Sequence, residues 1–397
     1  MGLFKDVKKP VIKHGVADGA GGPSHRPAYV AKTAPCIHSC PSGTDVRGWL
    51  VALAQHKAYG RTPEQAFEFA WRKILEHNPF PAICGRVCQH PCELNCNRKA
   101  KDSPLAVNKL EQFVGDFAIA QGLRAETLTP TRADAPRIAV VGAGPAGLSA
   151  AWHLARKGYA VTVIDAAPLP GGMMRSRIPR SVIPVDILDA EIENILGLGI
   201  ELRAGCVVGQ DLPLEELQRN FHVVFFAMGL QKAAQLELRA GTDGGAALIG
   251  ELPAEPPVIP AVETTEAIPR VLNTVSVAIA QGRAVAEAIS AHLEGRGATQ
   301  STASAVIRSE SLKLDWYPAA AQRVDSGVAM TETEALAEAA RCMSCGMCMD
   351  CETCWMYCSK NCFVKLPKGE HYKIKLDLCN GCGKCADSCP CGYIVMN

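Results

Sequence analysis

The stretch that decides the fold of the middle of the chain is Arg137-Ile138-Ala139-Val140-Val141-Gly142-Ala143-Gly144-Pro145-Ala146-Gly147. A short apolar run typical of a buried strand leads into a G-x-G-x-x-G loop, and an apolar helix follows through Ala155. A second strand covers 160–164 and ends at Asp165, 18 residues after Gly147. This order of strand, glycine loop, helix and acidic strand end predicts a Rossmann-like domain that binds a dinucleotide.

Each glycine of the loop has a physical role in that prediction. Gly142 permits the tight turn, Gly144 lets the backbone approach a pyrophosphate, and Gly147 lets the helix lie close to the strand. The N–H groups at the start of the helix and the helix dipole bind the phosphates. Asp165 is expected to accept hydrogen bonds from the adenosine ribose. A glycine-rich turn that binds nothing is the weaker alternative in this context.

The composition limits the classes of protein that the chain can belong to. Its 397 residues suit two to three domains, and its 48% hydrophobic and 20% charged residues are ordinary for a globular protein. The net charge of +1 gives no indication of a nucleic-acid or membrane-surface binder. The unusual feature is the number of cysteines, which is 19.

The start of the chain has no pattern of an export signal. Met1–Asp6 leads into a lysine-rich arm without the apolar stretch of a signal peptide. No run of about 18 apolar residues occurs, so we expect no membrane insertion. The expected location is the cytoplasm, where thiols stay reduced and available for iron or zinc.

The cysteines are concentrated at the two ends of the chain. Twelve lie between Cys342 and Cys391, and Cys206 stands alone in the middle as a plain buried thiol. The six cysteines of the first quarter are Cys36, Cys40, Cys84, Cys88, Cys92 and Cys96. Because a disulfide scaffold has no reason to be divided in this way, we interpret the ends as metal-cluster domains that flank the nucleotide domain.

The expected fold is a multidomain α/β protein. An N-cap pattern at Thr62-Pro63-Glu64-Gln65 predicts a helix with an apolar stripe through Ile74, and a second helix is expected over 107–121. The predicted units are an extended arm over 1–35, a helical iron–sulfur domain over 36–130, a Rossmann-like domain over 136–300, a linker over 301–334 and an α+β ferredoxin-like domain over 335–397.

The C-terminal cysteines follow the spacing of a bacterial ferredoxin. The run Cys379-x2-Cys382-x2-Cys385-x3-Cys389-Pro390 needs a partner with the same spacing, and only Cys348, Cys351, Cys354 and Cys358 supply it. In such pairs the fourth cysteine of each run binds the other cluster. The expected ligand sets are Cys348, Cys351, Cys354 and Cys389 for one [4Fe–4S] cluster, and Cys379, Cys382, Cys385 and Cys358 for the other. Four cysteines are left over, namely Cys342, Cys345, Cys362 and Cys391.

Zinc is the alternative metal for the C-terminal cysteines, because paired Cys-x2-Cys motifs also occur in zinc ribbons. Zinc does not explain the x3 step that is followed by proline, and we therefore favour iron–sulfur clusters. The segment has few large apolar residues, so we expect that cluster binding supplies its folding free energy.

Several motifs resemble the family of the glutamate synthase small subunit. In the middle these are Gly171-Gly172-Met173-Met174, Phe225-Phe226-Ala227-Met228-Gly229 and the helix 278–289, whose counterparts in that family lie beside the flavin. The N-terminal cysteines, the arm and the doubled C-terminal segment are similar to the branch that works with dissimilatory sulfite reductase, the DsrL type. The resemblance implies FAD as the dinucleotide, with Gly171, Gly172, Ala227 and Gly229 at its site.

The same resemblance implies an iron–sulfur site in the N-terminal domain. Six cysteines can hold one [4Fe–4S] cluster with two to spare, and the family's two extra cysteines upstream of the position of Cys36 are missing. We expect one cluster there. Its ligands are expected to be Cys40, Cys88 and Cys92, completed by Cys36, Cys84, Cys96 or the pair Glu111 and Gln112.

Two features of the family are absent from this sequence. Its second Rossmann domain, for NAD(P)H, would lie between Gly229 and Val262, where only the 32 residues 230–261 are present and no second fingerprint occurs. Its Gly-Asp pair before the closing helix is replaced by Val262–Ala267 without such a pair. NAD(P)H-dependent activity is therefore the family property that we expect least.

The sequence supports two hypotheses about function. The first is an oxidoreductase subunit that moves electrons between FAD, [4Fe–4S] clusters and a partner enzyme, a sulfite-reductase-type enzyme by resemblance, with no side chain acting as acid, base or nucleophile. The second is a non-catalytic electron carrier or assembly subunit in which the flavin site is vestigial.

Overall fold

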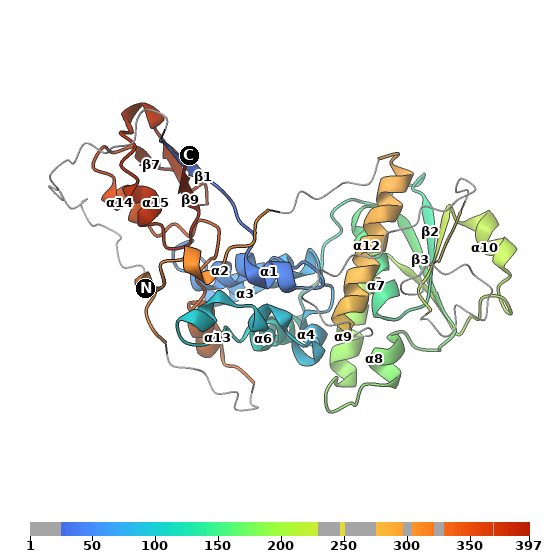
Figure 1. Cartoon of the computed structure of the whole chain (residues 1–397). Coiled ribbons are helices and arrows are strands. Elements are labelled where there is room, and N and C mark those ends of the chain that lie inside the picture. The colour runs from blue at the N-terminus through green and yellow to red at the C-terminus, as the bar shows by residue number, and fades with distance from the viewer. Residues whose placement is uncertain (1–24, 229–246, 251–274, 297–303, 321–328, 368) are drawn as a thin grey trace.

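The computed structural model describes residues 25–228, 247–250, 275–296, 304–320, 329–367 and 369–397. These residues form three units, and Figure 1 shows a helical unit in the middle, a sheet unit on one side and a small cysteine-rich unit on the other. The order along the chain differs from the order in space, because both ends of the chain contribute to the small unit.

The helical unit is built from short helices near the start of the chain. The predicted helix after Thr62 is confirmed as α3, and its N-terminus carries a complete capping box with Gln65. Its buried face includes Phe67, Trp71 and Ile74, as the apolar stripe predicts. The α-helices of this unit are α1 (Pro35–Ser39), α2 (Val46–Ala54), α3 (Pro63–Leu75), α4 (Pro81–Val87), α5 (Pro91–Leu94) and α6 (Val107–Ala120), and a 3-10 helix covers Asn97–Ala100.

A helix from the far end of the chain also belongs to the helical unit. Helix α13 (Glu332–Ala339) starts with a capping box between Thr331 and Glu334, inside the segment that the sequence predicts as a linker. It packs against α2 and α6, and its Ala335 and Ala339 are fully buried. The helix therefore brings the residues that follow it, from Arg341 onward, next to the N-terminal cysteines.

The sheet unit has the predicted Rossmann-like topology. Strands β2 (Arg137–Val141), β3 (Ala160–Asp165), β4 (Glu201–Ala204) and β5 (Val223–Phe226) are parallel, and β6 (Ala247–Gly250) is antiparallel to β5. The spatial order is β4-β3-β2-β5-β6, with the crossovers expected for a nucleotide-binding sheet. The helices are α7 (Pro145–Arg156), α8 (Gly172–Ser176), α9 (Val185–Leu196), α10 (Leu214–Asn220) and α12 (Val275–Leu293).

Helices α7 and α12 lie side by side on the face of the sheet that is directed toward the helical unit (Figure 1). Their close contact requires Gly282, because a Cβ there would lie 2.1 Å from the carbonyl oxygen of Ala146. The tight pairing fixes the start of α12 against the rest of the nucleotide domain.

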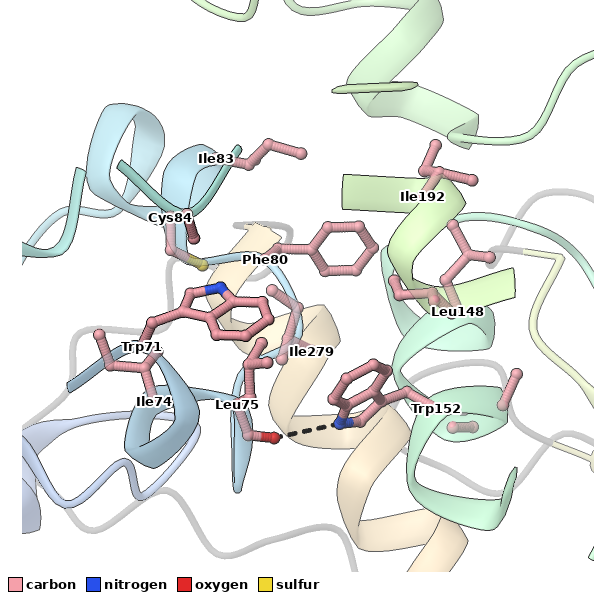
Figure 2. Close-up of a cluster of buried hydrophobic side chains, with 14 of the residues drawn as sticks. Trp71, Ile74, Leu75, Phe80, Ile83, Cys84, Leu148, Trp152, Ile192 and Ile279 are labelled. Atoms are coloured by element: carbon pink, nitrogen blue, oxygen red, sulfur yellow. Dashed lines mark hydrogen bonds between the residues drawn. The ribbon is translucent and has the colours of Figure 1, made fainter. Parts of the chain in front are cut away.

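An apolar cluster joins the sheet unit to the helical unit. Figure 2 shows Trp71 and Phe80 of the helical unit near Leu148, Ile279 and Trp152 of the sheet unit. The indole N–H of Trp152 donates a hydrogen bond of 3.1 Å to the carbonyl of Leu75, so this buried polar group has a partner across the interface. One continuous core therefore fixes the two units relative to each other.

The small unit combines a strand from each end of the chain. Strand β1 (Pro27–Tyr29), in the segment predicted as an extended arm, pairs with β9 (Ile394–Met396), and β7 (Phe363–Lys365) pairs with β8 (Tyr372–Ile374). Two short helices, α14 (Thr353–Tyr357) and α15 (Lys384–Asp387), complete the unit. The ring of Tyr29 stacks on Tyr393, and its hydroxyl donates to the carbonyl of Tyr372.

The structure describes 304–320 and 329–334 of the predicted linker, and the segment 304–320 is packed against both ends of the chain. Val306 forms a β-bridge with Thr33, and Ile307 and Tyr317 are buried. Two 3-10 helices cover Ser309–Ser311 and Leu314–Trp316. The predicted boundaries of the domains stay predictions. Across the described ranges, no helix has the length and apolar character that are needed to cross a membrane.

Candidate redox site

The glycine loop lies between β2 and the start of α7, as the sequence predicts. Gly142 has φ of +115°, and a Cβ on it would lie 2.6 Å from the carbonyl oxygen of Ala227. A Cβ on Gly147 would lie 1.9 Å from the carbonyl oxygen of Gly142. The packing of the chain itself therefore excludes a side chain at both positions.

Gly144 differs from the other two glycines of the loop. A Cβ on Gly144 would have no atom of the described chain within 4 Å, and the backbone there has an ordinary φ of −80°. The fold therefore gives no reason for a glycine at this position. An open space above Gly144, at the N-terminus of a helix of 12 residues, is where a pyrophosphate would approach the backbone. The loop thus fits a dinucleotide.

The predicted segment Gly171-Gly172 closes one side of this space. The N–H of Gly171 donates a 2.8 Å hydrogen bond to the carbonyl of Ala143. A Cβ on Gly172 would lie 2.8 Å from the Cα of Gly144. The structure therefore brings together the loop 142–147 and the segment that starts at Gly171.

The carboxylate of Asp165 contacts the loop directly. One of its oxygens accepts a hydrogen bond from the N–H of Ala143, and the other accepts from the N–H of Ala167 at 2.7 Å. A carboxylate has about four lone-pair sites, so acceptor capacity remains for ribose hydroxyls. Ala227 follows β5 at the same edge of the sheet and donates from its N–H to Val141.

Some predictions about the nucleotide site concern residues outside the described ranges. Gly229 and most of the interval 230–261 are among them, and only β6 of that interval is described. The segment 262–267, where the family has its Gly-Asp pair, also lies outside them.

Three N-terminal cysteines and a glutamate form a first group, which we define as Cys40, Cys88, Cys92 and Glu111. They come from the residue after α1, the residue after α4, helix α5 and helix α6. Burial raises the pKa of Cys88 to about 11, and the nearby Glu111 carboxylate adds to this rise, as it does for Cys40 and Cys92. Burial also raises the pKa of Glu111 itself to about 7.

Cys84 lies next to the first group but also within the apolar core. Its thiol is buried and lies 3.6 Å from the side-chain oxygen of Asn78, whose amide donates to Glu111 at 2.9 Å. Figure 2 shows Cys84 beside Trp71 at the edge of the apolar cluster. Cys84 and Glu111 thus both lie beside these three cysteines, and a role of Cys84, Glu111 or Gln112 as the fourth ligand stays a prediction.

Cys36 and Cys96 are associated with two C-terminal cysteines and not with the first group. Burial raises the pKa of Cys36, and the nearby thiols of Cys342, Cys345 and Cys96 add to the rise. We define these four cysteines as the second group. Cys342 and Cys345 lie outside the two ferredoxin-spaced runs, but their Cys-x2-Cys spacing directly after a helix is itself a pattern that indicates metal ligands.

The eight cysteines with ferredoxin spacing line two separate cavities of the small unit. The first contains Cys348, Cys351, Cys354 and Cys389 together with the additional Cys391. The second contains Cys358, Cys379, Cys382 and Cys385 together with the additional Cys362. The fourth cysteine of each run therefore lies in the cavity of the other run.

Backbone N–H groups point at several of these sulfur atoms. The N–H of Asp350 donates to Cys348 at 3.4 Å, that of Gly381 to Cys379 at 3.4 Å, and that of Cys362 to Cys358 at 3.2 Å. Such N–H···S hydrogen bonds stabilise thiolates and tune the potential of clusters that the thiolates ligate. The cavities therefore suit a sulfur-ligated group.

The fold and the cysteine groups define a class of protein, a redox protein with an iron–sulfur domain and a Rossmann-like nucleotide domain. Two family models agree with this class. Residues 23–123 match dihydropyrimidine dehydrogenase domain II, a 4Fe-4S cluster domain, and residues 140–190 match an NAD(P)-binding Rossmann-like domain.

Particular relatives are subunits of oxidoreductases. The chain is 35% identical over 249 residues to the NADP(+)-dependent formate dehydrogenase subunit beta of Moorella thermoacetica, which covers 58% of this chain and 33% of the relative. It is 33% identical to the NADPH-Fe(3+) oxidoreductase subunit beta of Geobacter sulfurreducens, over 54% of this chain and 30% of the relative. It is 34% identical to the NAD-dependent dihydropyrimidine dehydrogenase subunit PreT of Escherichia coli, over 53% and 49%. The matched part of the chain thus covers 30% to 49% of the length of these relatives.

Proposed function

We propose that the chain is an iron–sulfur flavoprotein subunit that moves electrons between a bound FAD, its [4Fe–4S] clusters and a partner redox enzyme. The observation that carries this proposal is the arrangement of the C-terminal cysteines in two cavities. Each cavity is lined by three cysteines of one run and the fourth cysteine of the other, which is the crossed ligand pattern of a two-cluster ferredoxin.

The nucleotide site and the first cysteine group are connected through the start of α12. Ser276 lies in the first turn of that helix, and its carbonyl accepts a hydrogen bond of 3.4 Å from the hydroxyl of Ser42, two residues after Cys40. Ser276 also contributes a side-chain hydrogen bond to Cys88. A cluster on the first group would therefore lie beside the helix that borders the nucleotide domain.

The proposed ligands of the first group are Cys40, Cys88 and Cys92, with Glu111 or Cys84 as the fourth. The 4Fe-4S family match over 23–123 supports iron in this unit. When bound, FAD would exchange two electrons with one carrier and single electrons with the clusters. The residues of the chain would hold its pyrophosphate at Gly144 and its ribose at Asp165.

The choice of FAD and of the partner depends on the resemblance to the DsrL type. That resemblance supports a sulfite-reductase-type enzyme as the partner. The relatives are subunits named beta or parts of larger oxidoreductases, which supports a partner protein in general. The match of 140–190 to an NAD(P)-binding model makes NAD(P) the competing nucleotide.

A second candidate function is an electron carrier whose nucleotide site stays empty. The observation that favours it is the hydrogen bonding of Asp165 to Ala143 and Ala167, since the carboxylate is already occupied in part by the backbone of the chain. In this case the Rossmann-like unit would be a scaffold for the clusters.

Anaerobic purification with iron, acid-labile sulfide and flavin analysis tests both candidates. One FAD per chain together with cluster iron supports the first function, and iron without flavin supports the second. Bound NAD(P) in place of FAD, or reduction of the clusters by NADPH, would contradict the assignment of the nucleotide. Zinc in place of iron would contradict both functions.

Two glycine variants sharpen this test. Gly144→Ala should leave the fold unchanged, because its Cβ meets no described atom, but should lower the flavin content by about tenfold or more through a clash with the pyrophosphate. Gly147→Ala is the contrasting variant, because its Cβ clashes with Gly142 and should lower the melting temperature as well. A Gly144→Ala protein with full flavin would show that the loop does not hold the pyrophosphate.

A further inference from the structure

The second cysteine group has no role in the ferredoxin-type pattern or in the first group. We propose that Cys36, Cys96, Cys342 and Cys345 bind a further [4Fe–4S] cluster, whose ligands come in pairs from the two ends of the chain. The inference rests on the proposed function, because it assumes that this chain binds iron–sulfur clusters. It adds a cluster that joins the helical unit to the small unit.

Hydrogen bonds to backbone carbonyl groups hold the two pairs of cysteines next to each other. The guanidinium of Arg98, two residues after Cys96, donates a 3.0 Å hydrogen bond to the carbonyl of Arg341, the residue before Cys342. The N–H of Lys32 donates at 3.0 Å to the carbonyl of Gly346, the residue after Cys345. Each end of the Cys342–Cys345 turn is therefore tied to a segment that carries an N-terminal cysteine.

The backbone of the Cys342–Cys345 turn and of Gly346 allows this close approach to Lys32. Gly346 has φ of +79°, and a Cβ on it would lie 2.5 Å from the carbonyl oxygen of Lys32. Ser344, between the two cysteines, also adopts a positive φ of 48° and is fully buried. A non-glycine residue in this region is strained, so the surrounding structure must hold the Cys-x2-Cys turn in place.

Asn97, the residue after Cys96, also contacts the Cys342–Cys345 turn. The amide of Asn97 donates to the carbonyl of Ile307 at 3.1 Å and also contributes a side-chain hydrogen bond to Cys345. The 3-10 helix that starts at Asn97 thus reaches both the turn and the segment 304–320. Four thiols from three separate parts of the chain converge in this way without forming a disulfide.

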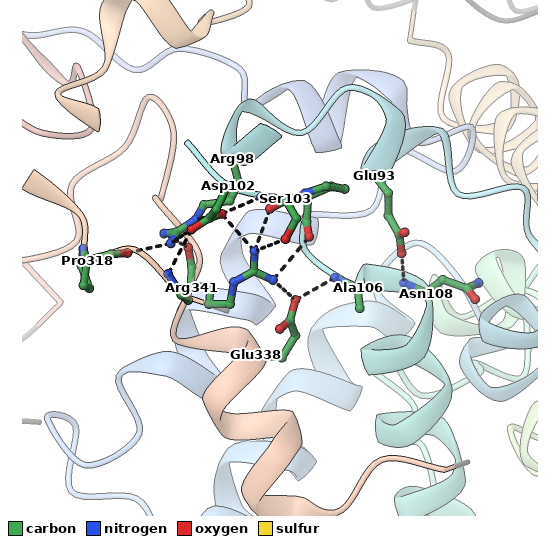
Figure 3. A network of polar contacts seen from close by, with 11 residues as sticks. Glu93, Arg98, Asp102, Ser103, Ala106, Asn108, Pro318, Glu338 and Arg341 are labelled. Atoms are coloured by element: carbon green, nitrogen blue, oxygen red, sulfur yellow. Dashed lines mark hydrogen bonds and ion pairs between the residues drawn. The ribbon is translucent and has the colours of Figure 1, made fainter. Parts of the chain in front are cut away.

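The charges around the second group suit an anionic cluster. Arg98 and Arg341 are 2% and 7% exposed, so their guanidinium groups are held inside the protein. Asp102 pairs with both of them, and Glu338 pairs with Arg341 at 2.6 Å (Figure 3). Burial raises the pKa of Cys342 and the pKa of Cys96, and the guanidinium groups of Arg98 and Arg341, respectively, oppose this rise. Cations held near the sulfur atoms stabilise a negatively charged iron–thiolate group.

A buried tyrosine lies near both the second group and the first cavity of the small unit. The buried hydroxyl of Tyr317 donates to the carbonyl of Met343 at 2.8 Å. Burial raises the pKa of Tyr317 well above its usual range, and the thiols of Cys391, Cys345, Cys342 and Cys351 add to this rise. Tyr317 is therefore close both to the second group and to the first cavity of the small unit. A cluster on the second group would connect that cavity with the helical unit.

The iron content of the unmodified protein is the first test. Four [4Fe–4S] clusters require about sixteen iron and sixteen sulfide ions per chain, whereas three require about twelve of each. After anaerobic reconstitution, sixteen supports the inference. Twelve would overturn it and leave the proposed function intact, and a protein without iron would overturn both. Zinc bound in addition to twelve iron would also overturn it.

A double variant and a control variant assign the additional iron. Cys342→Ser/Cys345→Ser should lower the iron content by about four per chain and remove one [4Fe–4S] component from the Mössbauer spectrum. The matched control is Cys206→Ser, which removes a thiol of the sheet unit outside both cysteine groups and both cavities and should keep the full iron content. An unchanged iron content in the first variant would overturn the inference, as would an equal loss in both.

Discussion

The sheet unit and the small unit hold themselves together in different ways. The core of the sheet unit consists of large apolar side chains such as Val140, Phe225 and Trp152, all buried. Among the buried residues of the small unit that pack together, five are cysteines and only Phe363, Tyr372 and Ile394 are large and apolar. The first unit can therefore fold by burial of apolar surface, whereas we expect the folding of the second to depend on clusters bound by its cysteines.

The largest effect that we predict follows from this difference. Removal of iron with a chelator under reducing conditions should unfold the small unit, because its ligands then remain as buried thiols without a partner. The sheet unit should stay folded. Limited proteolysis followed by mass spectrometry should show rapid cleavage after residue 345 and slow cleavage within 137–226.

The control for this prediction is reconstitution with iron and sulfide, which should restore the resistance to cleavage. Equal resistance of both units in the absence of iron would contradict the comparison, since the small unit would then fold by its own apolar contacts.

The second prediction concerns the apolar core that the sheet unit shares with the helical unit. Trp152→Ala should lower the free energy of unfolding by about 3–5 kcal/mol, because it leaves a cavity between α7 and Leu75 and removes a buried hydrogen bond. Chemical denaturation measures the effect.

Trp316→Ala is the matched control, since its side chain is 45% exposed. It should change stability by less than about 1 kcal/mol. A similar loss in both variants would mean that Trp152 does not join the two units as Figure 2 indicates.

The structure also shows which features can be predicted from the sequence. The strands β2 and β3, the helix α7 and the helix α3 follow from local patterns, and the structure confirms them with nearly the same bounds. The crossed grouping of the ferredoxin-spaced cysteines follows from their spacing alone. Their role as ligands stays a prediction.

Other features cannot be seen in local sequence because they depend on contacts between distant segments. Cys36 and Cys342 are separated by more than 300 residues, and contacts between distant segments, such as the packing of α13 against α2, bring them together. In the same way, β1 reads as an irregular arm until β9 pairs with it. Spacing rules apply within one run of cysteines and give no information about two runs at opposite ends of a chain.

The third prediction tests a polar contact between the helical unit and the sheet unit. Glu191 of α9 is buried, and its two carboxylate oxygens accept hydrogen bonds from the N–H groups of Ala82 and Ile83 at 2.7 and 3.1 Å. It thereby caps the start of α4, the helix that carries Cys84. Glu191→Gln replaces one acceptor by a donor, and should cost about 1–3 kcal/mol of unfolding free energy.

Glu193→Gln, on the exposed side of the same helix, is the control and should leave the stability nearly unchanged. If the two variants behave alike in chemical denaturation, the cap of α4 contributes nothing to the junction of the units.

The smallest predicted effect concerns the pH dependence of the sheet unit. Burial lowers the pKa of His153 on α7 to about 3, and the charges of Arg283 on α12 and Arg156 on α7 add to this, together with His77. Between the two pKa values, of about 3 in the folded protein and near 6.5 in the unfolded chain, His153 is therefore neutral in the folded protein but protonated in the unfolded chain. Its contribution to stability is complete above pH 6.5 and is lost as the pH falls toward 3, by about 1.4 kcal/mol per pH unit.

Urea denaturation at pH 7 and at pH 5.5 measures this loss. The pKa of His77 is also lowered, mainly by burial, so it contributes a loss of the same sign. His153→Gln does not titrate and should reduce the difference between the two pH values without removing it. An equal loss of stability in the variant and in the unmodified protein would contradict the prediction. It would mean that His153 takes up a proton in the folded protein as readily as in the unfolded chain. Burial and the charges of Arg156 and Arg283 would then not lower its pKa.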